Sequence, residues 1–271
     1  MSEPTITSLQ NPRVKNAVRL RSARQRTSRE RFLIDGAREL LLAMAAGVEL
    51  EEVFVCPSLC RDDDARQARA KLDALRVRKW HVAPAVFEKL AFGERAEGLL
   101  AVAVTPRLRL PDLRLPHDAL VAVLEGIEKP GNVGAVLRSA DGAGLSAAIV
   151  ADGGTDLYNP NAIRASLGTI FTVPVCAATS EEALAWLLAE GFRIVAARLQ
   201  DARPYTEIDF RGRVAIVLGS EATGLSLVWQ TSDVLGARLP QLGRADSLNV
   251  SAAAAVLFYE ALRQRGEVAG S

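Results

Sequence analysis

Three segments of the chain combine glycine with polar side chains that could hold a ligand or take part in a reaction. They are residues 125–144 (EGIEKPGNVGAVLRSADGAG), 214–226 (VAIVLGSEATGLS) and 239–262 (LPQLGRADSLNVSAAAAVLFYEAL). The first carries Asn132 among glycines, with Arg138 one helical turn after Gly134. The second ends an apolar run in Gly219-Ser220-Glu221, and the third has Ser247 and Asn249 where a long Ala-rich helix begins. A guanidinium and main-chain amides in such loops could bind a phosphate or stabilise a negative charge that develops during a reaction, and a carboxylate could face a positive charge.

Each segment alone also has an ordinary structural explanation. Ser and Asn are good helix caps, glycines make turns, and Arg138 could be a surface residue of a helix. Together they are more informative, because all three lie next to strands expected in one sheet, and open α/β sheets bind ligands beyond the carboxyl ends of their strands. The loops lack a phosphate-binding P-loop, and two histidines leave little scope for a Ser-His-Asp triad. The pattern therefore favours backbone cradling of a neutral or cationic cofactor beside one arginine.

Strands and helices alternate after a proline-rich stretch at 105–118, which predicts an α/β fold with a mostly parallel sheet and helices on both faces. Strands are expected at Ala119–Glu125, Ala147–Ala151, Val173–Ala177, Arg193–Ala197, Val214–Leu218 and Ala237–Pro240. Helices are expected at Val133–Ala143, Asn161–Leu167, Glu181–Glu190 and Leu248–Arg265.

A smaller α/β domain is predicted before that stretch, within residues 29–104. Its expected elements are a helix in 36–50, a strand at 51–56, a helix at Asp62–Arg76, a strand at 77–83, a helix at Pro84–Leu90 and a strand at 98–104. Three prolines fix the backbone at 105–118, so this stretch is predicted to be an extended linker. The expected organisation is a first domain at 1–105, a linker at 106–118 and a second domain at 119–271.

Composition places few limits on function. The chain has 271 residues, 49% of them hydrophobic and 24% charged, which is typical of a globular protein. No apolar run approaches the roughly 18–20 residues that span a bilayer, and no signal-peptide core begins the chain, so a cytoplasmic protein without a membrane segment is expected. Three cysteines and two histidines show no paired metal-ligand spacing, so no metal site is expected.

Charge is distributed unevenly although the net charge is +1. Residues 1–105 hold 18 basic and 14 acidic residues, while residues 106–271 hold 15 and 18. Eight basic residues lie within residues 1–31, a density suited to phosphate groups or simply to a solvated helix face. The arginines expected to contact such phosphates are Arg21, Arg24, Arg26 and Arg29.

The three loop segments resemble the signature motifs of the SpoU/TrmH family within the SPOUT superfamily. The matching residues are NVGAVLRSA at 132–140, LGSEATGLS at 218–226 and LPQLGRADSLNVSAAAAVLFYE at 239–260, and IRASLGTIFTVPV at 163–175 is similar to the segment between the first two motifs. ITSLQNPRVKNAVRL and EGLLAVA in the first domain are similar to a substrate-binding domain with an L30e/L7Ae-like fold. Members of this family are S-adenosylmethionine-dependent RNA ribose 2′-O-methyltransferases.

The resemblance implies a trefoil knot in the second domain, a homodimer with active sites near the subunit interface, and S-adenosylmethionine bound in the knot. Carried over by motif, the cofactor contacts would be Leu218, Gly219, Ser220, Leu239, Gln241, Ser247, Leu248 and Asn249. Gln241 stands where many members have Met, a change that a backbone contact tolerates. The residues expected at the reaction are Asn132, Arg138, Glu221 and Asn249, with Ser247 capping the last helix.

Chemistry assigns Arg138 a particular role, because a guanidinium stays protonated and is a poor base. We expect it to hold a phosphate and stabilise charge on the attacking oxygen, with Glu221 structuring its loop and a possible electrostatic role near the sulfonium. The expected substrate is ribosomal RNA, 23S above all, and some family members protect ribosomes from antibiotics in this way. Transfer RNA methylation and a non-catalytic role in RNA binding or ribosome assembly remain the alternatives.

Overall fold

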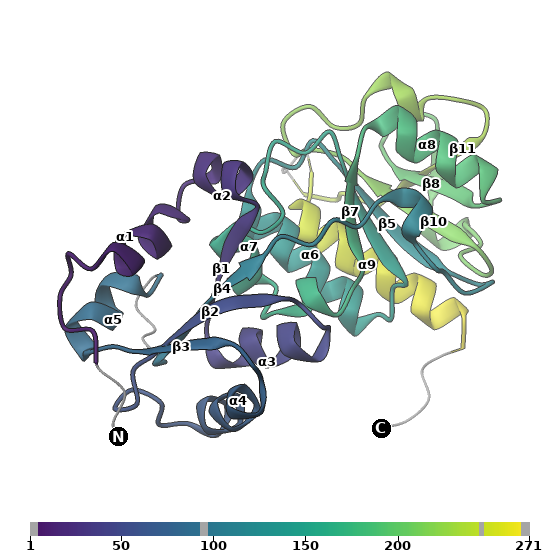
Figure 1. The fold of residues 1–271 in the computed structure, drawn as a ribbon. Coiled ribbons are helices and arrows are strands. Elements are labelled where there is room, and N and C mark those ends of the chain that lie inside the picture. Colours follow the sequence, from purple (N-terminus) through teal and green to yellow (C-terminus); the bar gives the residue numbers. More distant parts are fainter. Residues whose placement is uncertain (1–4, 93–96, 244–246, 267–271) are drawn as a thin grey trace. The chain divides into compact units, whose positions relative to one another are not determined.

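The computed structural model describes residues 5–92, 97–243 and 247–266, and it divides the chain into two compact units (Figure 1). The N-terminal unit comprises Met1–Pro106 and Tyr158–Thr172, and the C-terminal unit comprises Arg107–Leu157 and Val173–Ser271. Tyr158–Thr172 therefore packs with the first unit, although the boundaries expected from the sequence place it in the second domain.

The C-terminal unit is built on a seven-stranded sheet in the order β7-β6-β5-β10-β8-β11-β9, and every pairing in it is parallel. The strands are β5 (Leu120–Glu125), β6 (Ala147–Ala151), β7 (Val175–Ala178), β8 (Arg193–Ala197), β9 (Ala202–Pro204), β10 (Val214–Leu218) and β11 (Val234–Arg238). β10 lies between β5 and β8, which precede it in the chain. Because all strands run the same way, their carboxyl ends meet at one edge of the sheet.

Helices cover both faces of this sheet, which explains why its central strands are continuous apolar runs. α8 (Ser180–Ala189) packs on one face through Ala183 and Leu187. α6 (Pro130–Gly142) and α9 (Val250–Gln264) pack against each other, and Figure 1 shows them on the opposite side from α8. The α/β architecture expected from the sequence is confirmed.

All six strands expected in this unit are present, with small shifts at their ends. β9 was not expected, because it has only three residues and ends in Pro204. The last helix begins at Val250 rather than Leu248.

The N-terminal unit contains a four-stranded mixed sheet in the order β1-β4-β2-β3. Its strands are β1 (Arg31–Asp35), β2 (Leu50–Val55), β3 (Arg78–His81) and β4 (Leu99–Val104), and its helices are α1 (Pro12–Arg19), α2 (Ala23–Arg29), α3 (Ala37–Ala45), α4 (Asp63–Ala74), α5 (Pro84–Leu90) and α7 (Pro160–Ala165). β1, which the sequence analysis did not propose, pairs with β4 in antiparallel register.

Aromatic contacts hold the 158–172 segment in this unit. The rings of Tyr158 and Phe171 lie against Phe32 of β1, with centroid distances of 4.6 and 6.1 Å. Gly168 has a φ of +84°, and a Cβ there would lie 2.9 Å from Leu42 of α3. The close packing explains why this short segment belongs to the first unit.

Within the part of the chain that the structure describes, no helix combines the length and apolarity needed to cross a membrane.

Candidate active site

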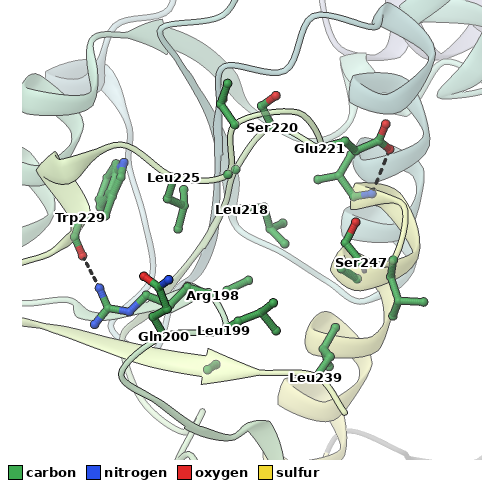
Figure 2. Close-up of a pocket in the computed structure, with 18 of the residues that line it drawn as sticks. Arg198, Leu199, Gln200, Leu218, Ser220, Glu221, Leu225, Trp229, Leu239 and Ser247 are labelled. Carbon is green, nitrogen blue, oxygen red and sulfur yellow. Dashed lines mark hydrogen bonds between the residues drawn. The ribbon is translucent and has the colours of Figure 1, made fainter. Parts of the chain in front are cut away.

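A pocket of about 760 Å³ opens at the carboxyl ends of β8, β10 and β11 (Figure 2). This volume lies in the usual range of small-molecule sites, about 300–1,000 Å³. Its lining combines leucine side chains with serines, glutamines and main-chain atoms, as a purine nucleoside with polar substituents would require. The lining residues include Leu218, Gly219, Ser220, Glu221, Leu225, Leu239, Gln241, Ser247 and Leu248.

The loop after β10 folds back tightly on itself, and glycine makes this possible. The amide of Gly224 donates to the Ser220 carbonyl at 2.9 Å, and Gly224 has a φ of +68°. A Cβ on Gly219 would lie 2.5 Å from the backbone carbon of Gly224. The second motif therefore needs glycine at position 219 to form this wall of the pocket.

Glu221 joins all three motifs in one hydrogen-bond network. Its Oε1 accepts from Asn132 Nδ2 at 3.3 Å, from Asn249 Nδ2, and from the Val250 amide at 3.3 Å. Asn249 Nδ2 also donates to Asn132 Oδ1 at 3.4 Å, and Lys129 Nζ lies 3.6 Å from Glu221 Oε2. One carboxylate thus connects the start of α6, the loop after β10 and the start of α9.

Asn249, not Ser247, is the N-cap of α9, so the expectation of a Ser247 cap is wrong. Its side chain accepts from the Ser251 amide at 3.0 Å, which satisfies one of the free amides of the first turn. The helix begins two residues later than expected, so Ser247 lies ahead of it and lines the pocket instead. Residues 244–246 of the third motif lie outside the described residues.

The pocket brings together all but one of the residues expected to contact the cofactor. The exception is Asn249, which does not line it but contacts Glu221, which does. Asn132 lies next to the pocket through the same network. Arg138 is exposed on α6 and does not line the pocket of its own chain.

The loop after β8 forms a further wall that the sequence analysis did not propose. Arg198, Leu199, Gln200 and Asp201 line the pocket, and so do Trp229 and Thr231. Arg198 Nη1 donates to the Trp229 carbonyl at 3.1 Å, and Figure 2 shows this pair across the pocket from Ser247. The signal for the first four was available, because the loop follows a strand whose carboxyl end lies at the same edge of the sheet.

Two of the four arginines expected to contact RNA are used inside the N-terminal unit. Arg26 is only 3% exposed and donates to the Leu20 and Arg21 carbonyls, both at 2.8 Å. Arg21 Nη2 donates to the carbonyls of Lys89, Leu90 and Ala91 at the end of α5. The expectation for Arg26 is corrected, since its buried guanidinium satisfies backbone carbonyls. Arg21 is partly exposed and stays a prediction, as do Arg24 and Arg29, which are exposed on α2.

Comparison with known proteins identifies both parts of the chain. Residues 119–259 match the model of the SpoU rRNA methylase family, and residues 11–101 match that of an MRM3-like substrate-binding domain. The 23S rRNA (guanosine(2553)-2′-O)-methyltransferase RlmP of Bacillus subtilis is 28% identical over 254 residues, which are 94% of this chain and 97% of that protein.

Two crystal structures extend the comparison to the fold. An RNA 2′-O ribose methyltransferase is 43% identical, with a TM-score of 0.83 over 96% of this chain and 99% of that chain. The SpoU methyltransferase AviRb from Streptomyces viridochromogenes, in complex with the cofactor AdoMet, is 28% identical, with a TM-score of 0.84 over 97% of this chain and 100% of that one. The second and third motifs line one pocket, and Glu221 connects the first motif to them. Together with this arrangement, these matches show that the chain belongs to the SpoU rRNA methylase family.

Proposed function

We propose that this protein transfers a methyl group from S-adenosylmethionine to the 2′-oxygen of one ribose in structured RNA, and that this RNA is 23S ribosomal RNA. The observation that carries the proposal is the pocket at the ends of β8, β10 and β11, where Glu221 connects the three motifs. Support for the reaction and substrate comes from RlmP, which is named for 2′-O-methylation of 23S rRNA and aligns over nearly the whole chain.

The described residues fit this cofactor. Leu218, Leu239 and Leu248 offer apolar contacts for a purine and its ribose, while Ser220 and Ser247 offer hydrogen-bonding groups. The tight turn at Gly219 exposes main-chain atoms beside them. When bound there, S-adenosylmethionine would supply an electrophilic methyl group on a positively charged sulfur.

The protein must then align the ribose oxygen and stabilise the charge that develops as its proton leaves. Glu221, Asn132 and Asn249 fix the relative positions of the motif loops, and the Glu221 carboxylate adds negative charge to the pocket wall. Arg138 would hold a neighbouring phosphate and stabilise the oxygen, since its guanidinium is a fixed cation rather than a base.

We propose that the protein is a homodimer in which Arg138 of one copy reaches the pocket of the other copy, where it would hold the phosphate and stabilise the oxygen. Arg138 is exposed on α6, and the neighbouring α9 exposes Val256 and Tyr259, which are 38% and 51% accessible. Apolar side chains on a helix pair are suited to an isologous interface. We further propose that the chain from β8 to α9 forms the trefoil knot, which is compatible with the position of β10 between β5 and β8.

The N-terminal unit would bind the RNA, as its match to a substrate-binding domain supports. Arg24 and Arg29 are exposed on α2, and Lys15 and Arg19 are exposed on α1. These charges suit phosphate contacts without base specificity. We include a cytoplasmic location in the proposal, which a ribosomal RNA substrate supports.

Methylation of RNA with isotopically labelled S-adenosylmethionine tests the proposal. The protein is incubated separately with unmodified 23S, 16S and transfer RNA, and modified riboses are mapped by their resistance to alkaline cleavage. We expect label in 23S RNA at one ribose. Label confined to transfer RNA would overturn the substrate, and label on a base or no transfer at all would overturn the reaction.

A further inference from the structure

Glu125, the last residue of β5, is a buried carboxylate that accepts four hydrogen bonds. It is 5% exposed. Its Oε1 accepts from Ser180 Oγ at 2.6 Å, Ser226 Oγ at 2.7 Å and Trp229 Nε1 at 2.9 Å. Its Oε2 accepts from the Ser226 amide at 2.8 Å. All four donors are neutral groups.

Three of these four bonds hold residues that line the cofactor pocket or lie next to its lining. Ser226 follows Leu225, which lines the pocket, and begins the short helix η4 (Leu227–Trp229). Trp229 is 1% exposed, lines the pocket, and accepts from Arg198 Nη1 through its carbonyl. Figure 2 shows Leu225, Trp229 and Arg198 on the side of the pocket away from Ser247. Glu125 thus connects the middle of the sheet to the wall opposite α9.

The fourth bond, from Ser180 Oγ, connects Glu125 to α8 instead of to the pocket. Ser180 is the first residue of α8 and does not line the pocket. The same oxygen therefore holds one hydroxyl from the residue next to the pocket lining and one from a helix that only covers the sheet. This difference allows the two roles to be separated experimentally.

A carboxylate at this place is hard to explain by packing alone. Burying a charge costs free energy unless hydrogen bonds replace its water, and an apolar residue at the end of β5 would avoid that cost. Four hydrogen bonds to its two oxygens instead fix the donors in orientation as well as distance. The loop from Gly219 to Trp229 is then held near its start by Glu221 and at its end by Glu125.

We propose that Glu125 is a positioning residue that sets the shape of the S-adenosylmethionine pocket by anchoring Ser226 and Trp229. The inference rests on the proposed function, because it takes that cofactor as the ligand. Neither Glu125 nor Ser226 lines the pocket, so Glu125 acts through Trp229, which does, and through Leu225, the lining residue next to Ser226.

Two serine variants test the proposal by removing equivalent hydroxyls from the same carboxylate oxygen. Ser180→Ala and Ser226→Ala should both lower the melting temperature, because each leaves Glu125 one donor short. Only Ser226→Ala should weaken S-adenosylmethionine binding, by about tenfold in calorimetric Kd. Ser226→Thr, which keeps the hydroxyl, should restore the wild-type Kd.

Glu125→Gln provides a second test. An amide group at the position of Oε2 would face the Ser226 amide with a second donor, so we expect a loss of affinity of at least about tenfold. In the cofactor-free protein, hydrogen exchange at the Ser226 amide should accelerate, with protection of the β10 amides unchanged.

The outcomes separate this inference from the proposed function. If wild-type protein fails to bind S-adenosylmethionine, the proposed function falls and so does the assignment of Glu125 to that ligand. If wild-type protein binds it but Ser180→Ala and Ser226→Ala alter Kd equally or not at all, the positioning role is wrong while the proposed function stands. Unchanged Ser226 exchange in Glu125→Gln would also overturn the anchoring.

Discussion

Asn249 combines two tasks in one side chain, since its oxygen caps α9 and its nitrogen contacts Glu221 and Asn132. Asn249→Ala should therefore lower stability by about 0.5–2 kcal/mol through the lost cap. It should also weaken S-adenosylmethionine binding and slow methyl transfer, because the motif loops lose their connection. Calorimetry and thermal unfolding of the same preparation measure both effects.

A matched control exists in the N-terminal unit. Asn159 caps α7 by accepting from the Asn161 amide at 2.9 Å, far from the motif residues in sequence. Asn159→Ala should cost comparable stability and leave cofactor affinity unchanged. Wild-type affinity and turnover in Asn249→Ala would contradict the role we assign to this residue.

Asp35 should make the N-terminal unit sensitive to pH. Burial raises the pKa of its carboxyl from 3.8 to about 7, against the opposing hydrogen bond from the Phe92 amide. The folded state therefore keeps a proton that the unfolded chain releases, and stability from this group falls as pH rises from about 4 through about 7. Asp35→Asn keeps an acceptor for Phe92 but cannot titrate.

Urea unfolding at pH 5 and pH 8 checks this sign. Wild-type protein should lose more stability between the two pH values than Asp35→Asn does. Equal losses in both proteins would show that Asp35 does not titrate in that window.

Elements differ in how well the sequence predicts them, and β10 and β9 show why. β10 is a run of five buried apolar residues, a pattern that is typical of a strand inside a parallel sheet. β9 has only three residues, and its pairing with β11 determines its strand conformation. The assignment of Tyr158–Thr172 to the first unit also depends on contacts distant in sequence, such as Tyr158 against Phe32.

In the candidate site too, features set by local sequence could be predicted, and features set by contacts between distant segments could not. The three motifs, with Glu221 and Asn249, could be found from residue types and resemblance. Arg198 could also have been found, because its loop directly follows the predicted strand β8. Trp229 could not, because its place in the pocket depends on its hydrogen bond with Arg198 and on the order of the strands. The prediction that Arg26 contacts RNA was wrong for a related reason, since only the structure shows that its guanidinium is buried and donates to backbone carbonyls.

The tight conformation of the loop after β10 requires glycine at position 219. Gly219→Ala would place a Cβ 2.5 Å from the backbone of Gly224, so the loop must open and the pocket wall must move. We expect cofactor affinity to fall by about tenfold or more, equivalent to about 1.4 kcal/mol, measured by calorimetry.

Gly154→Ala is the control for this change. A Cβ there would meet Glu128 at an ordinary 3.5 Å. Its affinity should match that of wild-type protein, and an unaffected Gly219→Ala would show that the loop adapts without cost.

The whole molecule is proposed to be a dimer in which Arg138 serves the pocket of the other copy. Arg138→Lys keeps the charge but loses the planar fork, so turnover should fall by about 10²–10³ with cofactor binding little changed. Arg211→Lys, at an exposed pair with Asp209, should leave turnover unchanged.

Mixed dimers test which copy supplies the arginine. Arg138→Lys and Gly219→Ala protein are unfolded together, refolded and assayed at S-adenosylmethionine well below the wild-type Kd, where the Gly219→Ala pocket is mostly empty. They should regain about a quarter of the wild-type rate under the same conditions, because half the dimers are mixed and each contains one intact site. If both residues act within one chain, mixing should restore nothing.

The central claim is that main-chain atoms and leucines at the ends of β8, β10 and β11 hold the methyl donor. A crystal structure of the protein with S-adenosylmethionine measures this most directly. We predict the donor in the pocket lined by Leu218, Leu239 and Leu248, with Glu221 still bonded to Asn132 and Asn249. Density for the donor elsewhere on the chain, with this pocket filled only by water, would contradict the account.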